Sequence, residues 1–131
     1  MTTTAQYSDI FDVGSALRSV GGDREFLGEL LGLTQAAWPT LLADIHGGLE
    51  RRDFGTVETC ARLVKAAARN VSARRTYESA LHLETMAHGG NLPAAQKAHM
   101  DLEREVDLLR FILGSLGRDE FPPAYVAAAQ E

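Results

Sequence analysis

The sequence predicts an all-α fold, an antiparallel four-helix bundle with a short additional helix at its N-terminal end. Apolar residues recur every three or four positions along most of the 131-residue chain, which is the period of an amphipathic helix. No stretch of alternating β-branched residues competes with this period. Glycine, asparagine and aspartate separate the periodic stretches, as they do at helix ends. The short connections between the last helices favour neighbours that run in opposite directions.

The N-terminal half holds the short helix and one long helix. Residues 9–20 form an amphipathic segment that Gly21-Gly22 ends, and Asp23 is a suitable N-cap for the next helix. Pro39 lies inside that long helix and predicts a kink, because proline removes one backbone hydrogen bond. The long helix is expected to bury one stripe, formed by Phe26, Leu27, Leu30, Thr34, Ala37, Trp38, Leu41, Ile45 and Leu49.

The C-terminal half predicts three further helices. Asp53 is suited to cap the first of them and Asn91 the third, while the second runs from about Ala73 to Ala87. The expected buried stripe of the first consists of Val57, Cys60, Ala61, Val64, Ala67, Ala68 and Val71. The expected seam of the third, a near-heptad pattern that suits an antiparallel bundle, consists of Ala95, Leu102, Val106, Leu109, Leu113 and Leu116.

Length and composition predict a single cytoplasmic domain. A hydrophobic content of 45% and a charged content of 24% are typical of soluble proteins, and the chain is long enough to bury a core. We expect an N-terminal tail over residues 1–8, the bundle over residues 9–117 and a C-terminal tail over residues 118–131. Cys60 is the single cysteine, which fits a reducing compartment. The start of the chain lacks the features of a secretory signal, and no apolar stretch approaches the roughly 20 residues that span a bilayer.

Charge and motifs exclude several classes of function. A net charge of −5 argues against a dedicated nucleic-acid binder. The sequence has no Cys-x-x-Cys, His-Glu-x-x-His or Gly-x-Gly-x-x-Gly pattern, and no histidine follows a glutamate by three positions. We therefore expect neither a metal nor another cofactor, and no membrane partner.

The third expected helix, which Asp53 is suited to cap, carries a basic stripe on the side opposite its buried residues. Glu58, Arg62, Lys65 and Arg69 follow one another at spacings of 4, 3 and 4, and the sequence from Arg62 to Arg75 contains no acidic residue. The simplest interpretation is a solvated helix face on which Glu58 and Arg62 pair at i, i+4.

The same stretch, from Cys60 to Asn70, resembles the signature helix of histidine phosphotransfer (HPt) domains, the four-helix modules of bacterial phosphorelays. That family carries a pattern close to Ala-His-x-Leu-Lys-Gly-Ser-Ala. In this register Lys65 matches the family lysine, and Ala66 and Ala67 replace the small residues after it. The phosphorylated histidine belongs three positions before the lysine, where this chain has Arg62.

The resemblance extends over roughly residues 9–116. Its further pieces are Phe11-Asp12, Gly21-Gly22-Asp23, Trp38-Pro39, Asp53-Phe54, Leu83-Glu84 and Gly89-Gly90-Asn91-Leu92. In order and at these spacings, they imply the HPt fold and a place in two-component signalling.

The substitution at position 62 changes the function that the resemblance implies. Neutral imidazole has a lone pair and titrates near pH 6.5, whereas a guanidinium stays protonated and only donates hydrogen bonds. The resemblance thus implies a monomeric module with no catalytic residue, which docks the receiver domain of a response regulator and does not carry phosphate. Its expected contact residues are Glu58, Arg62, Lys65, Ala66 and Arg69. A histidine kinase is a further partner that the family implies.

Other hypotheses stay open. The chain could be an active phosphotransfer protein that uses His46, His82, His88 or His99, although surface or capping roles are the simpler expectation for each. It could also be a purely structural helical bundle. Nucleic-acid binding through the basic stripe has little support, because no aromatic residues are interleaved with the basic ones.

Overall fold

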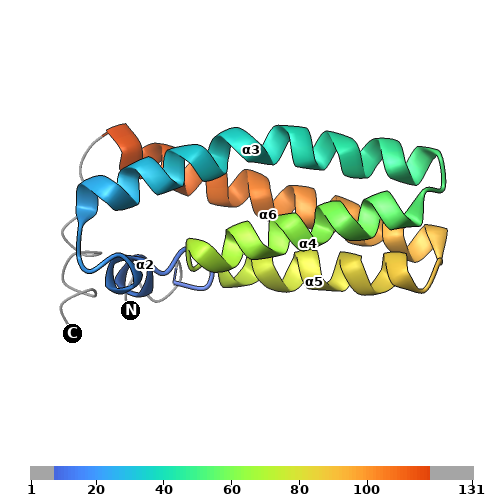
Figure 1. Ribbon diagram of the computed structural model, residues 1–131, viewed down its shortest axis with the longest axis horizontal. Helices are drawn as coiled ribbons and strands as arrows, with labels where there is room; N and C mark the ends of the chain where they lie inside the picture. The colour runs from blue at the N-terminus through green and yellow to red at the C-terminus, as the bar shows by residue number, and fades with distance from the viewer. Residues whose placement is uncertain (1–7, 119–131) are drawn as a thin grey trace.

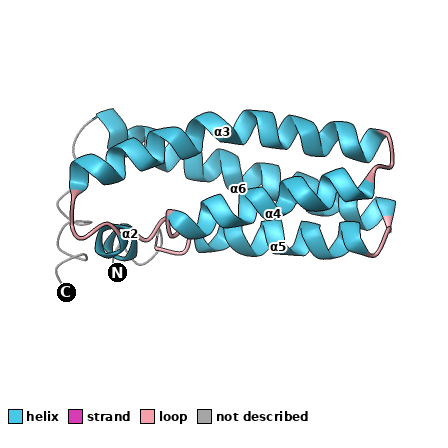
Figure 2. Cartoon of the chain, in the orientation of Figure 1, coloured by secondary structure: helices cyan, strands magenta, loops and turns pink. Residues whose placement is uncertain are grey.

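The protein is all-helical over the part of the chain that the structure describes. The computed structural model describes the backbone of residues 8–118 and the side-chain surroundings of residues 8–114. No strand occurs in this part, as Figure 2 shows. Its helices are α2 (Val13–Ser19), α3 (Arg24–Glu50), α4 (Phe54–Asn70), α5 (Arg74–His88) and α6 (Leu92–Arg118). The expected tails, and Leu116 of the expected seam, lie outside the described residues or side chains.

The long helices α3, α4, α5 and α6 lie side by side, and α2 lies across one end of them (Figure 1). Each long helix runs opposite to the one before it and is joined to it by a short turn, at 51–53, 71–73 and 89–91 (Figure 1). Helix α4 packs against both α3 and α5, and α6 packs against α5 and α3. No helix of the described residues is long and apolar enough to cross a membrane.

Side-chain caps begin four of the helices. The carboxylates of Asp12, Asp23 and Asp53 accept hydrogen bonds from the backbone N–H three residues further on, and Asn91 does the same through its amide oxygen. These bonds confirm the caps expected at Asp23, Asp53 and Asn91. Helix α2 begins at Val13, later than expected, because Asp12 is its cap.

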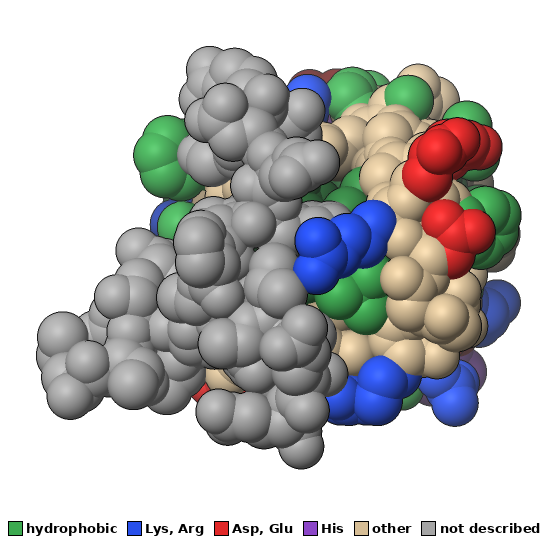
Figure 3. All heavy atoms as spheres, turned by 90° about the vertical axis from the view of Figure 1, so that its left-hand side faces the viewer, with side chains coloured by type: hydrophobic (Ala, Val, Ile, Leu, Met, Phe, Trp, Pro, Cys, Tyr) green, Lys and Arg blue, Asp and Glu red, His purple; other side chains and the backbone are tan. Residues whose placement is uncertain are grey.

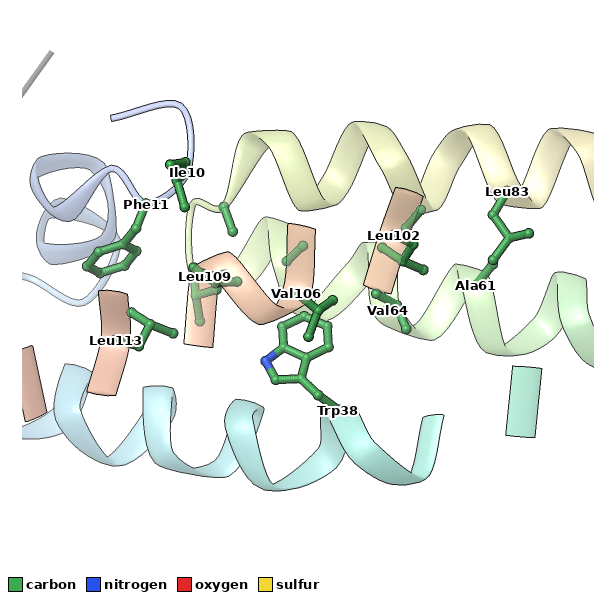
Figure 4. Close-up of a cluster of buried hydrophobic side chains, with 14 of the residues drawn as sticks. Ile10, Phe11, Trp38, Ala61, Val64, Leu83, Leu102, Val106, Leu109 and Leu113 are labelled. Atoms are coloured by element: carbon green, nitrogen blue, oxygen red, sulfur yellow. The ribbon is translucent and has the colours of Figure 1, made fainter. Parts of the chain in front are cut away.

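The core is built from the inward faces of the long helices and from the segment before α2. Trp38 of α3 projects toward Val106 of α6, and Phe11 and Ile10 lie at the α2 end of the cluster (Figure 4). The expected seam of α6 is confirmed, since Ala95, Leu102, Val106, Leu109 and Leu113 are all buried. The expected stripe of α4 is also buried, except for Ala67, which is partly buried.

The expected stripe of α3 is partly wrong. Phe26 is 51% exposed and Ala37 is exposed, whereas Leu27, Thr34 and Trp38 are buried. The two misplaced residues lie about 100° around the helix from their buried neighbours, so they fall beyond the arc that the other helices cover. A single-helix pattern does not fix the width of that arc.

Pro39 does not end α3, which continues from Arg24 to Glu50. Gly48 near its C-terminal end allows a close approach of α4. A Cβ atom at Gly48 would lie 2.9 Å from Cγ2 of Val57 and 3.3 Å from the carbonyl oxygen of Asp53. The glycine therefore lets the backbones of α3 and α4 meet beside the turn that joins them.

The segment before α2 is attached to the α4–α5 turn by backbone hydrogen bonds. The N–H of Asp12 donates to the carbonyl of Ser72 at 3.0 Å, and the N–H of Arg75 donates to the carbonyl of Asp9 at 2.9 Å. These bonds fix the short N-terminal helix at the end of the molecule where α4 ends and α5 begins.

Candidate docking surface on α4

The outer face of α4 carries the residues that the sequence singled out. Val57, Ala61 and Val64 are fully buried against the neighbouring helices, so residues on the opposite side of α4 point away from the core. Ala66 is exposed there, and 54% of the Arg62 side chain is accessible. Position 62, which the resemblance aligns with a phosphorylated histidine, is therefore on the surface.

Glu84 of α5 binds two of the basic side chains of α4. Nε of Arg62 donates to Oε2 of Glu84 at 3.1 Å, and Nζ of Lys65 donates to Oε1 at 2.6 Å. Only 15% of the Glu84 side chain and 22% of the Lys65 side chain are accessible. The two cations are held side by side on one carboxylate, and the Lys65–Glu84 pair is largely shielded from water.

Glu58 adds a second carboxylate. Nη2 of Arg62 donates to Oε2 of Glu58 at 3.3 Å, and Nδ1 of His88 lies 3.2 Å from the same oxygen. We call Glu58, Arg62, Lys65, Glu84 and His88 the α4–α5 cluster. Its two carboxylates balance the guanidinium and the ammonium while His88 is neutral.

The cluster favours the charged form of Glu84. The hydrogen bond from Lys65 is the main cause that lowers the pKa of Glu84, and the bond from Arg62 adds to it. Partial burial acts in the opposite direction but does not outweigh these bonds. The carboxylate is thus ionised at neutral pH, and it keeps both cations oriented.

This arrangement confirms one expectation and corrects another. The i, i+4 pair between Glu58 and Arg62 is present. The basic stripe, however, is not simply a solvated face, because Glu84 of α5 forms ion pairs with Arg62 and Lys65. The sequence pattern of α4 could not predict this partner, since Glu84 lies 22 residues from Arg62. The one indication in the sequence was that Glu84 directly follows Leu83, a residue of the buried face of α5.

The rest of the outer face of α4 is open. Leu63 is 52% exposed, and Arg69 is exposed and forms no ion pair with another described residue. Arg69 lies apart from the α4–α5 cluster and lines a hollow of about 560 Å³ where α2 meets α4 and α5. Figure 3 shows this end of the molecule, where both basic and acidic side chains of the described residues reach the surface.

The expectation for the histidines holds for three of the four. His46 and His82 are exposed, and His88 is exposed at the last residue of α5. The surface role expected for His99 is wrong, because this residue is only 4% exposed. Its burial could have been predicted from the sequence, since residue 99 falls four places after Ala95 and three before Leu102, on the seam itself.

No group of three or more potential ligand side chains within residues 8–114 is arranged to hold a metal ion. The α4–α5 cluster offers ion pairing and hydrogen bonding, which suit the recognition of charged groups on a partner. No family model, no curated protein and no solved structure matches the chain.

Proposed function

We propose that this chain is an HPt-like signalling module, an antiparallel four-helix bundle of the bacterial cytoplasm, that docks the receiver domain of a response regulator and does not carry phosphate at position 62. One observation carries the proposal. Arg62 is exposed on the outer face of α4, with its guanidinium beside the ammonium of Lys65. This is where the resemblance places a phosphorylated histidine and its neighbouring lysine.

The chemistry of arginine supports docking without transfer. A guanidinium has no free lone pair near neutral pH, so Arg62 cannot form the nitrogen–phosphorus bond of a phosphohistidine. It does have five N–H donors, of which Nε and Nη2 each use one within the cluster. Nη1 has no hydrogen-bond partner among the described residues. That edge is available to a carboxylate of a partner.

Glu84 and Glu58 restrict what Arg62 can bind. They fix the guanidinium in one orientation, which lowers the conformational entropy lost on docking. They also neutralise its charge, so a partner must offer carboxylates close to the outer edge of the guanidinium to gain from it. A receiver domain, with acidic groups around its phosphorylated aspartate, has this chemistry.

The apolar part of the surface lies next to these charges. Leu63 and Ala66 are both exposed on α4, close in sequence to Arg62 and Lys65 of the cluster. A small side chain at Ala66 allows a partner to approach the helix closely, and Leu63 offers apolar area to bury. The kinase that the resemblance implies would compete for the same surface.

A phosphotransfer assay tests the proposal. The chain is incubated with a receiver domain labelled on its aspartate with ³²P, and no label is expected on the chain. In the variant Arg62→His, label on the introduced imidazole is expected if the docking surface is intact. Label on the unchanged chain would contradict the proposal, and absence of transfer to the variant would place the receiver surface elsewhere.

A second candidate function, phosphotransfer through another histidine, is favoured by the position of His88. Its Nδ1 faces Glu58, the carboxylate that also binds Arg62, and 80% of the side chain is accessible. Glu58 would hold the proton on Nδ1, so that Nε2 could attack the phosphorus of an acyl phosphate. The new N–P bond forms as the P–O bond to the receiver aspartate breaks and that aspartate leaves as a carboxylate.

His88→Gln separates the two functions. If the unchanged chain accepts label and His88→Gln does not, His88 is the acceptor and the docking-only function is wrong. His82→Gln is the matched control, because His82 is exposed on the same helix and outside the α4–α5 cluster. We expect neither variant to differ from the unchanged chain, since none of the three should be labelled.

A further inference from the structure

His99 is the one histidine of the described residues that lies in the core. It belongs to the buried seam of α6 and is 4% exposed. Its Nε2 has no hydrogen-bond partner, although a buried polar nitrogen usually has one. Oε2 of Glu103, one turn further along α6, is 3.8 Å from Nε2, too far for a hydrogen bond.

Helix α3 supplies the other groups around this imidazole. The ring centre of His46 lies 6.0 Å from that of His99, and the backbone of Leu42 lies close enough to act on the His99 ring. Nε2 of His46 itself lies 3.6 Å from Oε2 of the exposed Glu50. Within the described residues, α4 and α5 place no charged group that acts on His99.

We propose that His99, together with His46, forms a proton-sensitive contact that keeps α3 and α6 together while both rings are neutral and releases them when His99 is protonated. A charged imidazolium in this position would lose its hydration, and a second imidazolium from His46 would repel it. Glu103 offsets only part of this cost, because it is half exposed and not in hydrogen-bond contact.

The direction of the pH effect follows from how strongly the His99 ring binds a proton in the folded and in the unfolded chain. Burial, the main cause, lowers the pKa of His99 below its ordinary value of 6.5, His46 adds to this, and Glu103 and the backbone of Leu42 oppose it. Relative to the protonated ring, the neutral ring therefore stabilises the fold above pH 6.5. This contribution is lost as the pH falls through the lowered pKa.

The surface next to His99 offers room for the helices to separate. A hollow of about 320 Å³ lies between α3 and α6, lined by Leu42, Met100, Glu103, Arg104 and Asp107. Protonation is therefore expected to admit water along this seam first, while the α4–α5 side of the molecule stays closed.

Amide hydrogen exchange, measured at pH 7.5 and at a series of lower pH values that spans the titration of the His99 ring, tests the proposal. Protection factors of the amides of α3 and α6 that flank His46 and His99 should fall at least several-fold on acidification in the unchanged chain, and those of α4 and α5 should not. In His99→Gln, which cannot be protonated, this local fall should disappear. His82→Gln is the matched control and should behave like the unchanged chain.

Two results would overturn the proposal. One is a local fall in protection that persists in His99→Gln. The other is an NMR titration of the unchanged chain in which the His99 ring titrates at or above its ordinary value of 6.5 with no change in exchange. The NMR titration needs no variant, so it decides the question even if His99→Gln does not fold.

Discussion

The α4–α5 cluster and the contact of His46 with His99 between α3 and α6 both contain titratable side chains, but they differ in exposure and in hydrogen bonding. In the cluster, Arg62 and Lys65 lie near the surface, and each is bound to a carboxylate. Between α3 and α6, the His99 ring is buried and its Nε2 has no partner. The first arrangement keeps its charges, whereas the second is stable only without charge.

The difference shows how the two faces of one small helical protein can serve different ends. Charges that oppose each other at a partly open seam stay ionised and remain available to a partner. An unpaired titratable group in the core adds nothing to recognition but makes the packing depend on pH. The predictions below are ordered by the expected size of the effect on the free energy of unfolding or of pair coupling.

Glu84→Leu should have the largest effect, a loss of about 1–2 kcal/mol in the free energy of unfolding. The substitution leaves Lys65 and Arg62 side by side with no carboxylate between them. Urea denaturation at pH 7 measures it. Glu78→Leu, an exposed glutamate on the same helix, is the matched control and should cost much less.

The stability that Glu84 contributes should depend on pH. The pKa of Glu84 is lowered from its ordinary value of 4.5, so the carboxylate contributes stability above that pH and loses it as the pH falls through the lowered pKa. Stability curves of the unchanged chain and Glu84→Gln should therefore converge in acid. Curves that stay parallel down to about pH 2 would show that the cluster does not stabilise the charged form.

His99→Leu should have the opposite sign, a gain of about 1 kcal/mol at pH 7.5, because it removes a buried nitrogen that lacks a partner. The gain should grow as the pH is lowered, since leucine cannot be protonated. Urea denaturation of the unchanged chain and of His99→Leu, at pH 7.5 and at a lower pH, measures the difference in the free energy of unfolding at each pH. A clear loss of stability at pH 7.5 would mean that the imidazole is well satisfied in the core, and the contrast between the two regions would fail.

The Lys65–Glu84 and Arg62–Glu58 ion pairs should differ in strength. A double-mutant cycle with Lys65→Met and Glu84→Gln should give a coupling energy of about 1 kcal/mol, and one with Arg62→Met and Glu58→Gln about 0.3 kcal/mol. The reason is exposure, because more than half of the Arg62 side chain is accessible and the Lys65–Glu84 pair is largely covered. Equal couplings would show that this covering has no energetic effect.

Most of the fold could be predicted from local patterns. Asp23, Asp53 and Asn91 lie just before periodic stretches, and all three cap helices. Two helix ends were harder to recognise, because the left-handed residues that terminate α3 and α4 are Arg52 and Ser72, with φ of 54° and 59°, where glycine is the usual residue.

The site was only half predictable. The spacing of α4 alone puts Arg62, Lys65 and Ala66 outside its buried stripe, because a helix fixes which residues share a face. The partner of the two cations, Glu84, comes from another helix, and helix periodicity carries no information about which helices become neighbours. His99 was missed for a different reason, since a polar residue on an apolar seam is easily taken for a gap in the pattern.

The most direct test of the account is titration calorimetry of the chain with receiver domains of the source organism, because the proposed docking role requires that one of them binds. We expect one receiver to bind, and Arg62→Glu to weaken that binding by about tenfold or more. Arg110→Glu, a charge reversal at an exposed position of α6, should leave the affinity unchanged. Equal effects of the two reversals, or a receiver bound equally well by Arg62→Glu, would contradict the docking role of Arg62.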